Sequence, residues 1–328
     1  MVSVVPSITD ALLALHAYSD PLAWLSVGLF VAVAALELYR REWARTLGAL
    51  AWAEFGVFWL SLSPYYVFEM KSAIEGLLSL VALPACLYVG YLLYDGRDSL
   101  FVVTRAVAFM GIIFMPVNAI PALREWLIET VTLQTHWLMG VLGYHPVITT
   151  GPVFGYRSQF LFVRDGHQYK TYIEIVCTGI GSIAIFGGLV AAVRAPLRRK
   201  LRALAVVVPI IYVLNVVRNA WIALAFGNQW LQLFVPQVMG LLGYEKPGLV
   251  SFFLADRVLS QSLSLVVLVL IALFLARELP ELFVVVDDVL FVLTGREYDL
   301  REQMGGGEGG AGGTAGGSGS STVTDVGR

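Results

Sequence analysis

The chain has 328 residues, of which 58% are hydrophobic and 14% charged, and its formal net charge is −2. A soluble protein carries about 25% charged residues, so this composition excludes an ordinary soluble fold. Together with repeated long apolar runs it indicates an integral membrane protein, and the small negative net charge gives no reason to expect a nucleic-acid partner.

The chain begins with residues 1–19, a mildly amphipathic stretch that we expect at the membrane interface and that lacks the features of a cleavable signal peptide. Each apolar run that follows is near the roughly 20 residues needed to cross a bilayer. The sequence therefore predicts an all-α polytopic membrane protein with about seven transmembrane helices, in an N-terminal group (20–119) and a second group (174–276). The predicted spans are 20–39, 46–63, 72–94, 99–119, 174–193, 203–225 and 250–276.

Basic residues predict the orientation of these helices, because cytoplasmic connections are enriched in Lys and Arg. The connections after the first, third and fifth predicted spans are the basic ones, and the last of them, at 194–202, is the strongest. We therefore expect 194–202 in the cytoplasm, the N-terminus outside, and residues 120–173 and 226–249 outside. The residues concerned are Arg40, Arg41, Arg45, Arg97, Arg194, Arg198, Arg199, Lys200 and Arg202.

The outer segment 120–173 is too long to be a simple connection. Its part from Leu123 to Leu142 predicts an amphipathic interfacial helix. In the part from Val147 to Tyr172, aromatic, β-branched and polar residues alternate in the way typical of a β-hairpin, with Asp165-Gly166 as the turn. We expect this segment to cover a site at the outer surface.

After the last predicted span, residues 277–304 contain a predicted amphipathic helix at the cytoplasmic surface. From residue 305 to 328 the chain is rich in Gly, Ser and Thr and cannot bury a core. This composition predicts a disordered tail.

Cys177 has the most distinctive setting in the sequence. It lies in the run Glu-Ile-Val-Cys-Thr-Gly-Ile-Gly-Ser at 174–182, which opens the fifth predicted span. A helix N-terminus stabilises a thiolate, so the position predicts a lowered pKa for this thiol, and Gly179 and Gly181 let another backbone or a substrate come close. The competing interpretation, a Cys that acts as a small hydrophobic residue, fits Cys86 and stays open for Cys177. The different depths of the two cysteines exclude a disulfide.

Two arginines lie in the last two predicted spans, Arg218 near the outer end of one and Arg257 near the outer start of the other. An arginine at the centre of a spanning helix costs at least about 2.5 kcal/mol, which makes each a candidate functional residue, and snorkelling to the interface is the competing interpretation. The predicted boundaries place Cys177, Arg218 and Arg257 within about two helical turns of the outer surface. Three consecutive helices then bring a thiol and two guanidinium groups to one layer.

This combination of groups suits acyl transfer. A thiolate forms a thioester with a carbonyl group, and a guanidinium, which stays protonated, stabilises either the thiolate or the developing oxyanion. The two arginine roles can be assigned either way round, and the group that protonates the leaving amine stays open. Polar residues that we expect to orient or balance the arginines are Asn215, Asp256, Ser260, Glu174 and Ser182.

Glu54 and Arg105 lie inside the second and fourth predicted spans and are expected either to pair with each other or to line an internal cavity. An anion transporter or channel that uses Arg105, Arg218, Arg257 and Glu54 is therefore the alternative function, and a non-catalytic assembly factor is another. A transporter is expected to tolerate the loss of Cys177. The sequence carries no metal-ligand or nucleotide-binding pattern, so we expect no cofactor.

Three blocks of the sequence resemble the exosortase/archaeosortase family. They are Cys-Thr-Gly-Ile-x-Ser at 177–182, Asn-x-x-Arg at 215–218 and Ala-Asp-Arg at 255–257. In bacterial exosortases the third catalytic position is usually histidine, and Arg257 at this position fits the archaeal branch. The resemblance covers about residues 20–276 and is specific for the three blocks taken together.

The resemblance implies a membrane-embedded cysteine transpeptidase with Cys177 as the nucleophile and Arg218 and Arg257 as the catalytic arginines. Members of the archaeal branch process secreted proteins, including the surface-layer glycoprotein, that end in a Pro-Gly-Phe motif, a transmembrane helix and a basic cluster. They are thought to cleave near the motif and to join the new C-terminus to an archaeal isoprenoid lipid. The resemblance thus implies an active site on the extracytoplasmic side of the cell membrane.

Overall fold

The computed structural model describes residues 8–70, 72–164, 166–244 and 246–297. The predicted disordered tail at 305–328 lies outside the described residues. The first part of the chain is a helical bundle in which α3 packs against α2 and α4. Its elements are α1 (Ile8–His16), α2 (Ser19–Leu36), α3 (Arg41–Pro64), the π-helix η1 (Tyr65–Glu69), α4 (Ala73–Tyr94), the 3-10 helix η2 (Asp98–Leu100) and α5 (Phe101–Ala119).

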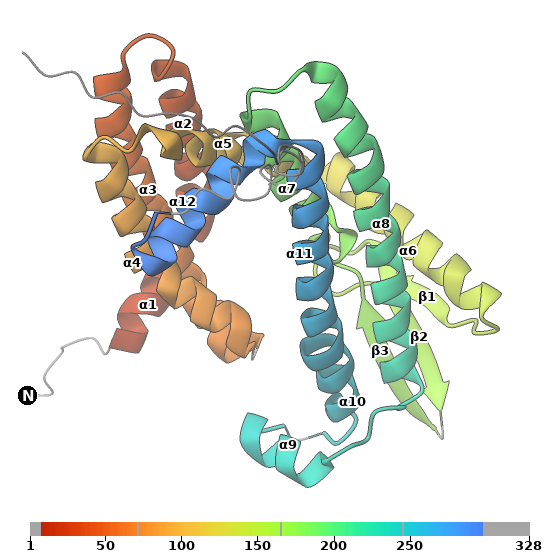
Figure 1. Cartoon of the computed structure of the whole chain (residues 1–328). Coiled ribbons are helices and arrows are strands. Elements are labelled where there is room, and N and C mark those ends of the chain that lie inside the picture. Colours follow the sequence, from red (N-terminus) through yellow and green to blue (C-terminus); the bar gives the residue numbers. More distant parts are fainter. Residues whose placement is uncertain (1–7, 71, 165, 245, 298–328) are drawn as a thin grey trace, which may run out of the picture.

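The second part combines helices with a small sheet (Figure 1). Its helices include the 3-10 helix η3 (Ile175–Thr178), which carries Cys177, and the π-helix η4 (Leu254–Ser260), which carries Arg257. The other elements are α6 (Pro121–Val141), β1 (Val147–Thr150), β2 (Arg157–Arg164), β3 (His167–Tyr172), α7 (Ile180–Ala192), α8 (Leu197–Gly227), α9 (Val235–Leu242), α10 (Leu249–Phe253), α11 (Gln261–Glu278), η5 (Pro280–Leu282) and α12 (Phe283–Thr294).

Among the described residues, six helical segments are long and apolar enough to cross a membrane, and α7 is a shorter apolar helix. The chain is therefore a multi-pass, mostly helical membrane protein, which confirms the predicted fold class. The fifth predicted span, 174–193, is shorter than expected. Its beginning forms η3, and Gly179 with φ +80° separates η3 from α7. The 13 residues of α7 rise about 20 Å, less than the ~30 Å hydrocarbon core.

The predicted hairpin is present and gains a third strand. β2 pairs antiparallel with β3, from Gln159 opposite Tyr172 to Arg164 opposite His167, and β1 pairs with the other edge of β2. Position 165 of the predicted turn lies outside the described residues. Phe160 and Phe162 of β2 pack with buried side chains of α6 and of the C-terminal part of α8, so the sheet is fixed against that end of α8.

We call this end of the helices the sheet end, and the opposite end, with the connection at 194–202, the basic end. α5 and α7 approach closely between the two ends, because a Cβ atom at Gly188 would lie 2.5 Å from the backbone oxygen of Ala106. Near the basic end, α12 runs from the end of the last span toward α4 and η2 (Figure 1). Asp288 of α12 accepts hydrogen bonds from Arg97 (2.7 Å) and Ser99 (2.8 Å), which ties the last span to the first bundle.

Candidate functional site

The backbone of Cys177 is attached to α8. Its N–H donates to the oxygen of Glu174 (2.9 Å), and its own oxygen accepts from Asn215 Nδ2 (2.5 Å) and Asn219 Nδ2 (2.7 Å). The two asparagines are four residues apart and so lie on one face of α8. They fill both lone pairs of the Cys177 carbonyl and fix the height of the thiol along α8.

Gly179 produces the bend that places Cys177 outside α7. With φ +80° it adopts the left-handed conformation, and a Cβ atom there would lie 3.2 Å from Asn215 Cγ. The close approach expected at this glycine is therefore made by the Asn215 side chain. Gly181 differs, because a Cβ atom there meets nothing within 4 Å. Cys177 precedes the first residue of α7 by three positions rather than lying in its first turn.

Arg218 and Arg257 lie at the same depth. Arg218 is 21 residues after Leu197 at the basic end of α8, and Arg257 is 21 residues before Glu278 at the basic end of α11. At 1.5 Å per residue each lies about 30 Å from the basic end, close to the thickness of the hydrocarbon core. The layer expected from the sequence is therefore formed at the sheet end.

A single carboxylate joins the two arginines. Asp256 Oδ1 lies 2.7 Å from Arg218 Nη2, and its Oδ2 lies 3.5 Å from Arg257 Nε. Arg257 also reaches the start of α4, where its Nη1 is 3.7 Å from Glu75 Oε1 and its Nη2 is 3.7 Å from the sulfur of Met70. The contact with Asp256 connects α8 to η4, and the contacts with Glu75 and Met70 connect η4 to the first bundle.

The electrostatics of Cys177 differ from the prediction. Cys177 lies outside the helices long enough to cross a membrane, and burial raises the pKa of its thiol. A hydrogen bond with the Glu174 backbone and the charge of Arg218 lower this pKa, whereas the charges of Asp256 and Glu174 raise it further. The predicted lowering of the thiol pKa is therefore wrong, because burial outweighs the groups that favour the thiolate.

Arg218 is the arginine whose charge acts on the thiol. Its charge acts on Cys177, its Nη2 is bound to Asp256, and its Nε is buried without an acceptor among the described residues. A buried N–H without a partner costs free energy, about 1–3 kcal/mol, that an incoming oxygen atom would recover. Arg257 is linked to this group through Asp256.

Glu174 and Tyr172 lie close enough to the thiol for their charges to interact with it. Burial raises the pKa of the Glu174 carboxyl, and no cation forms an ion pair with it in the described part of the chain. Burial also raises the pKa of Tyr172, and the charges of Glu174 and Cys177 raise it further. The site thus contains a partly buried carboxyl group without a counter-ion next to a thiol.

Two of the predicted supporting residues make no hydrogen bond to Cys177 or to either arginine among the described residues. Ser260 donates to the oxygen of Ala255 (2.6 Å), a local bond within η4. Ser182 lies in the first turn of α7, and among the described residues it makes no hydrogen bond to Cys177 or either arginine. Sequence reasoning missed Asn219, although its spacing from Asn215 is visible. It also missed Tyr172, Glu75 and Met70, because only the tertiary fold brings these residues to the site.

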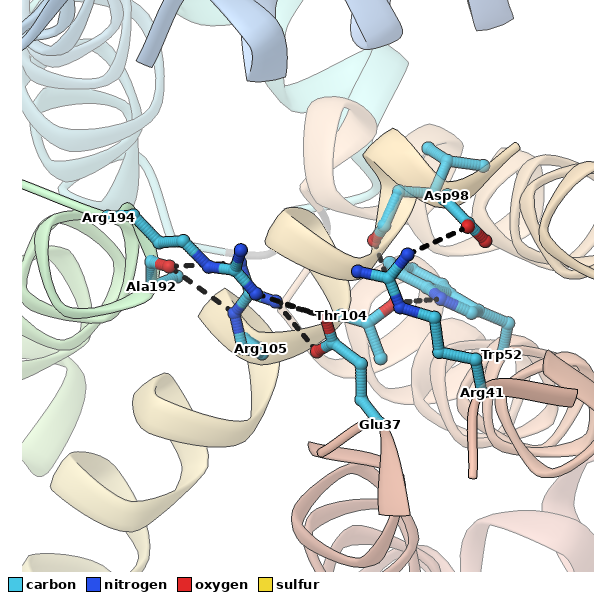
Figure 2. A network of polar contacts seen from close by, with 9 residues as sticks. Glu37, Arg41, Trp52, Asp98, Thr104, Arg105, Ala192 and Arg194 are labelled. Carbon is cyan, nitrogen blue, oxygen red and sulfur yellow. Dashed lines mark hydrogen bonds and ion pairs between the residues drawn. The ribbon is translucent and has the colours of Figure 1, made fainter. Parts of the chain in front are cut away.

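Glu54 and Arg105 are not a pair, which corrects one sequence interpretation. Glu54 accepts a hydrogen bond from Ser26 (2.6 Å), and Arg105 binds both oxygens of Glu37 (2.6 and 2.7 Å) (Figure 2). Glu54 lies about 20 Å along α3 from the basic end, whereas Arg105 lies about 10 Å along η2 and α5, so depth separates them.

The cysteines stay apart as expected. Cys86 is buried in the first bundle, Cys177 is half-buried at the sheet end, and both are free thiols.

The comparisons with known proteins agree on one family. The family described as transmembrane exosortase matches residues 20–255 of the chain. Archaeosortase A from Haloferax volcanii is 47% identical over 297 residues, which cover 88% of this chain and 98% of that protein. Archaeosortase A from Natronomonas pharaonis is 41% identical over 297 residues, or 88% of this chain and 93% of that protein. No solved structure matches the chain.

The two glycines of this segment make a matched test of the bend. Gly179→Ala is expected to destabilise the protein by about 1–3 kcal/mol, because alanine is strained at φ +80° and its Cβ atom contacts Asn215. It should also change the rate at which a maleimide alkylates Cys177 in a Cys86→Ala background. Gly181→Ala is expected to be neutral or stabilising by up to about 1 kcal/mol. Equal unfolding midpoints and alkylation rates for the two variants would contradict this account of the bend.

Proposed function

The chain belongs to the transmembrane exosortase family, and on that basis we propose that it is a membrane-embedded cysteine transpeptidase that forms a thioester on Cys177. Membership of the family implies a membrane-bound sorting enzyme of the sortase-type peptidase class. The observation that carries the proposal is the setting of Arg218. Its guanidinium is held by Asp256, its charge acts on Cys177, and its Nε–H has no acceptor among the described residues.

The proposed reaction begins when the Cys177 sulfur attacks the carbonyl carbon of a peptide bond. A carbon–sulfur bond forms, and the carbonyl oxygen becomes an oxyanion that accepts from the Arg218 Nε–H. The carbon–nitrogen bond then breaks, the leaving amine takes a proton, and an acyl thioester remains on Cys177. A hydroxyl group of the acceptor attacks the thioester and restores the thiol.

The two arginines receive different roles in this proposal. Arg218 is the catalytic partner of Cys177 and stabilises first the thiolate and then the oxyanion. Arg257 holds Asp256 from the other side and contacts Glu75 and Met70, so it keeps the Arg218–Asp256 pair in place against the first bundle. Asn215 and Asn219 position Cys177 through its backbone oxygen.

Glu174 is the proposed proton carrier. A general base works best when its pKa lies near the working pH, and burial raises the pKa of this carboxyl above its ordinary value. Asp256 suits the task less well, since it is the counter-ion of two guanidinium groups. Glu174 takes the proton of the Cys177 thiol as the sulfur attacks and returns it to the leaving amine.

The proposed substrates are secreted proteins that end in the sorting signal implied by the family resemblance: a Pro-Gly-Phe motif, a transmembrane helix and a basic cluster. The surface-layer glycoprotein is one, and an archaeal isoprenoid lipid is the proposed acceptor. In this arrangement the sheet end faces the outside, and the connection at 194–202 faces the cytoplasm, as the distribution of basic residues favours.

The transport alternative is less favoured by the geometry. Arg105 is bound to Glu37 at the basic end, whereas Arg218 and Arg257 share Asp256 about 30 Å from that end. Glu54 accepts a hydrogen bond from Ser26 at another depth. The four charges named for an anion path therefore belong to three separate local contacts.

The nucleophile is tested by replacing Cys177. Cys177→Ala and Cys177→Ser are both expected to abolish processing of a protein with the sorting signal, because a hydroxyl does not replace the thiolate. Membrane insertion and the unfolding midpoint should stay near those of the unchanged protein. Cys86→Ala is the matched control and should retain processing. Full processing by both Cys177 variants would overturn the enzyme proposal.

The role of Glu174 predicts a pH dependence. As pH falls through its raised pKa, the carboxyl becomes protonated and no longer accepts the thiol proton, so processing should fall at a higher pH than an ordinary glutamate would give. Glu174→Gln is expected to slow processing by about 10²–10⁴-fold and to remove this acidic limb. An unchanged rate and pH profile in Glu174→Gln would assign the proton transfer to another group.

A further inference from the structure

A cavity of about 240 Å³ opens at the basic end, far from Cys177. It lies between the start of α3, the end of α2, α5, the connection between α7 and α8, and the segment that leads into α12. Figure 2 shows the polar side chains around it, with Arg105 between Glu37 and Ala192 and with Arg41 directed toward Asp98. The charged residues that line it are Glu37, Arg41, Asp98, Arg105, Arg194 and Glu281.

Each carboxylate of this cavity already has a close cationic partner. Arg105 binds both oxygens of Glu37, at 2.6 and 2.7 Å, and donates to the oxygen of Ala192 at 3.2 and 3.3 Å. Arg45 Nε lies 2.9 Å from Asp98. Glu281, the third carboxylate of the lining, forms an ion pair with Arg199 at 2.5 Å.

Two arginines of the lining have longer and more exposed ion pairs. Arg194 reaches Glu37 at 4.0 Å with its side chain 77% exposed, and Arg41 reaches Asp98 at 3.4 Å with its side chain 55% exposed. In both cases another arginine holds the same carboxylate more closely. Three arginines and three carboxylates line the cavity, but a different arginine holds each carboxylate more closely, so Arg41 and Arg194 are left as the weakly paired cations of the lining.

We propose that Arg41 and Arg194 bind a phosphate-bearing anion at this cavity. A phosphate group carries the charge that balances two guanidinium groups and presents its oxygens in the geometry that the guanidinium fork prefers. The cavity lies where α2 ends and α3 begins, and because both helices are long enough to cross a membrane, we expect their ends at the level of the lipid headgroups. The phosphate of an anionic lipid headgroup and a free phosphate ester share this chemistry.

One further atom narrows the chemical class of the ligand. An oxygen of Glu281, Oε2, is buried without a hydrogen-bond partner among the described residues, and this residue lines the same cavity. A carboxylate oxygen accepts hydrogen bonds and repels a second anion, so it requires a donor from the ligand. A headgroup with a hydroxyl group beside its phosphate, as in a glycerol phosphate, supplies both.

The test uses the full-length protein in detergent and measures ligand binding by native mass spectrometry. The probes are phosphatidylglycerol, phosphatidylcholine, glycerol phosphate and inorganic phosphate. Arg41→Gln/Arg194→Gln is expected to weaken phosphatidylglycerol binding by about tenfold or more. Arg198→Gln/Arg277→Gln is the matched control, because it removes two exposed arginines near the basic end that do not line the cavity, and it should change binding by about twofold at most.

The outcomes separate the sources of the phosphate. Tight phosphatidylglycerol binding that glycerol phosphate does not displace assigns the site to a lipid headgroup, and displacement by glycerol phosphate assigns it to a soluble ester. Equal weakening by the two double variants, or equal binding of phosphatidylglycerol and phosphatidylcholine to the unchanged protein, would overturn the proposal. If Arg41→Gln/Arg194→Gln does not fold, each single variant is compared with Arg198→Gln under the same criteria.

Discussion

The contact of Asp256 with two guanidinium groups is the interaction on which the site depends. Burying a guanidinium group away from water costs free energy, and a carboxylate placed between Arg218 and Arg257 offsets part of that cost. Arg218 is held by its Nη2, and its Nε–H has no acceptor among the described residues. One carboxylate thus stabilises the pair, and the Nε–H remains as the donor that the proposed reaction uses.

The local backbone makes this arrangement possible. Asp256 and Arg257 are neighbours in sequence and lie in the π-helical segment η4, where the wider turn changes the direction of successive side chains. Ser260 donates to the oxygen of Ala255, five residues earlier, which satisfies a carbonyl within this turn. A second π-helix, η1, ends next to Met70, whose sulfur Arg257 contacts. Two irregular turns therefore meet at the arginine that joins the two parts of the protein.

Six of the seven predicted spans correspond to helices of spanning length in the described part of the chain, because length and apolar composition alone decide them, whereas the fifth is interrupted at Gly179. The sequence also placed Arg218 and Arg257 at one depth, since depth follows from counting residues along a helix. It did not predict the direction in which side chains point, which depends on how helices pack, and so one of its two interpretations paired Arg105 with Glu54, whereas Arg105 binds Glu37. The raised pKa of Cys177 was missed for a related reason: burial by the sheet and α8 is a tertiary effect that a helix-start pattern does not contain.

The central claim is that Cys177 carries the acyl group between cleavage and transfer. The most direct measurement is mass spectrometry of the full-length protein after brief incubation with a peptide that carries the sorting signal. We predict a covalent adduct on Cys177 whose mass equals the part of the peptide before the cleaved bond and which hydroxylamine releases, as it does a thioester. Continued processing with no adduct on Cys177, or with an adduct on another residue, would contradict the account.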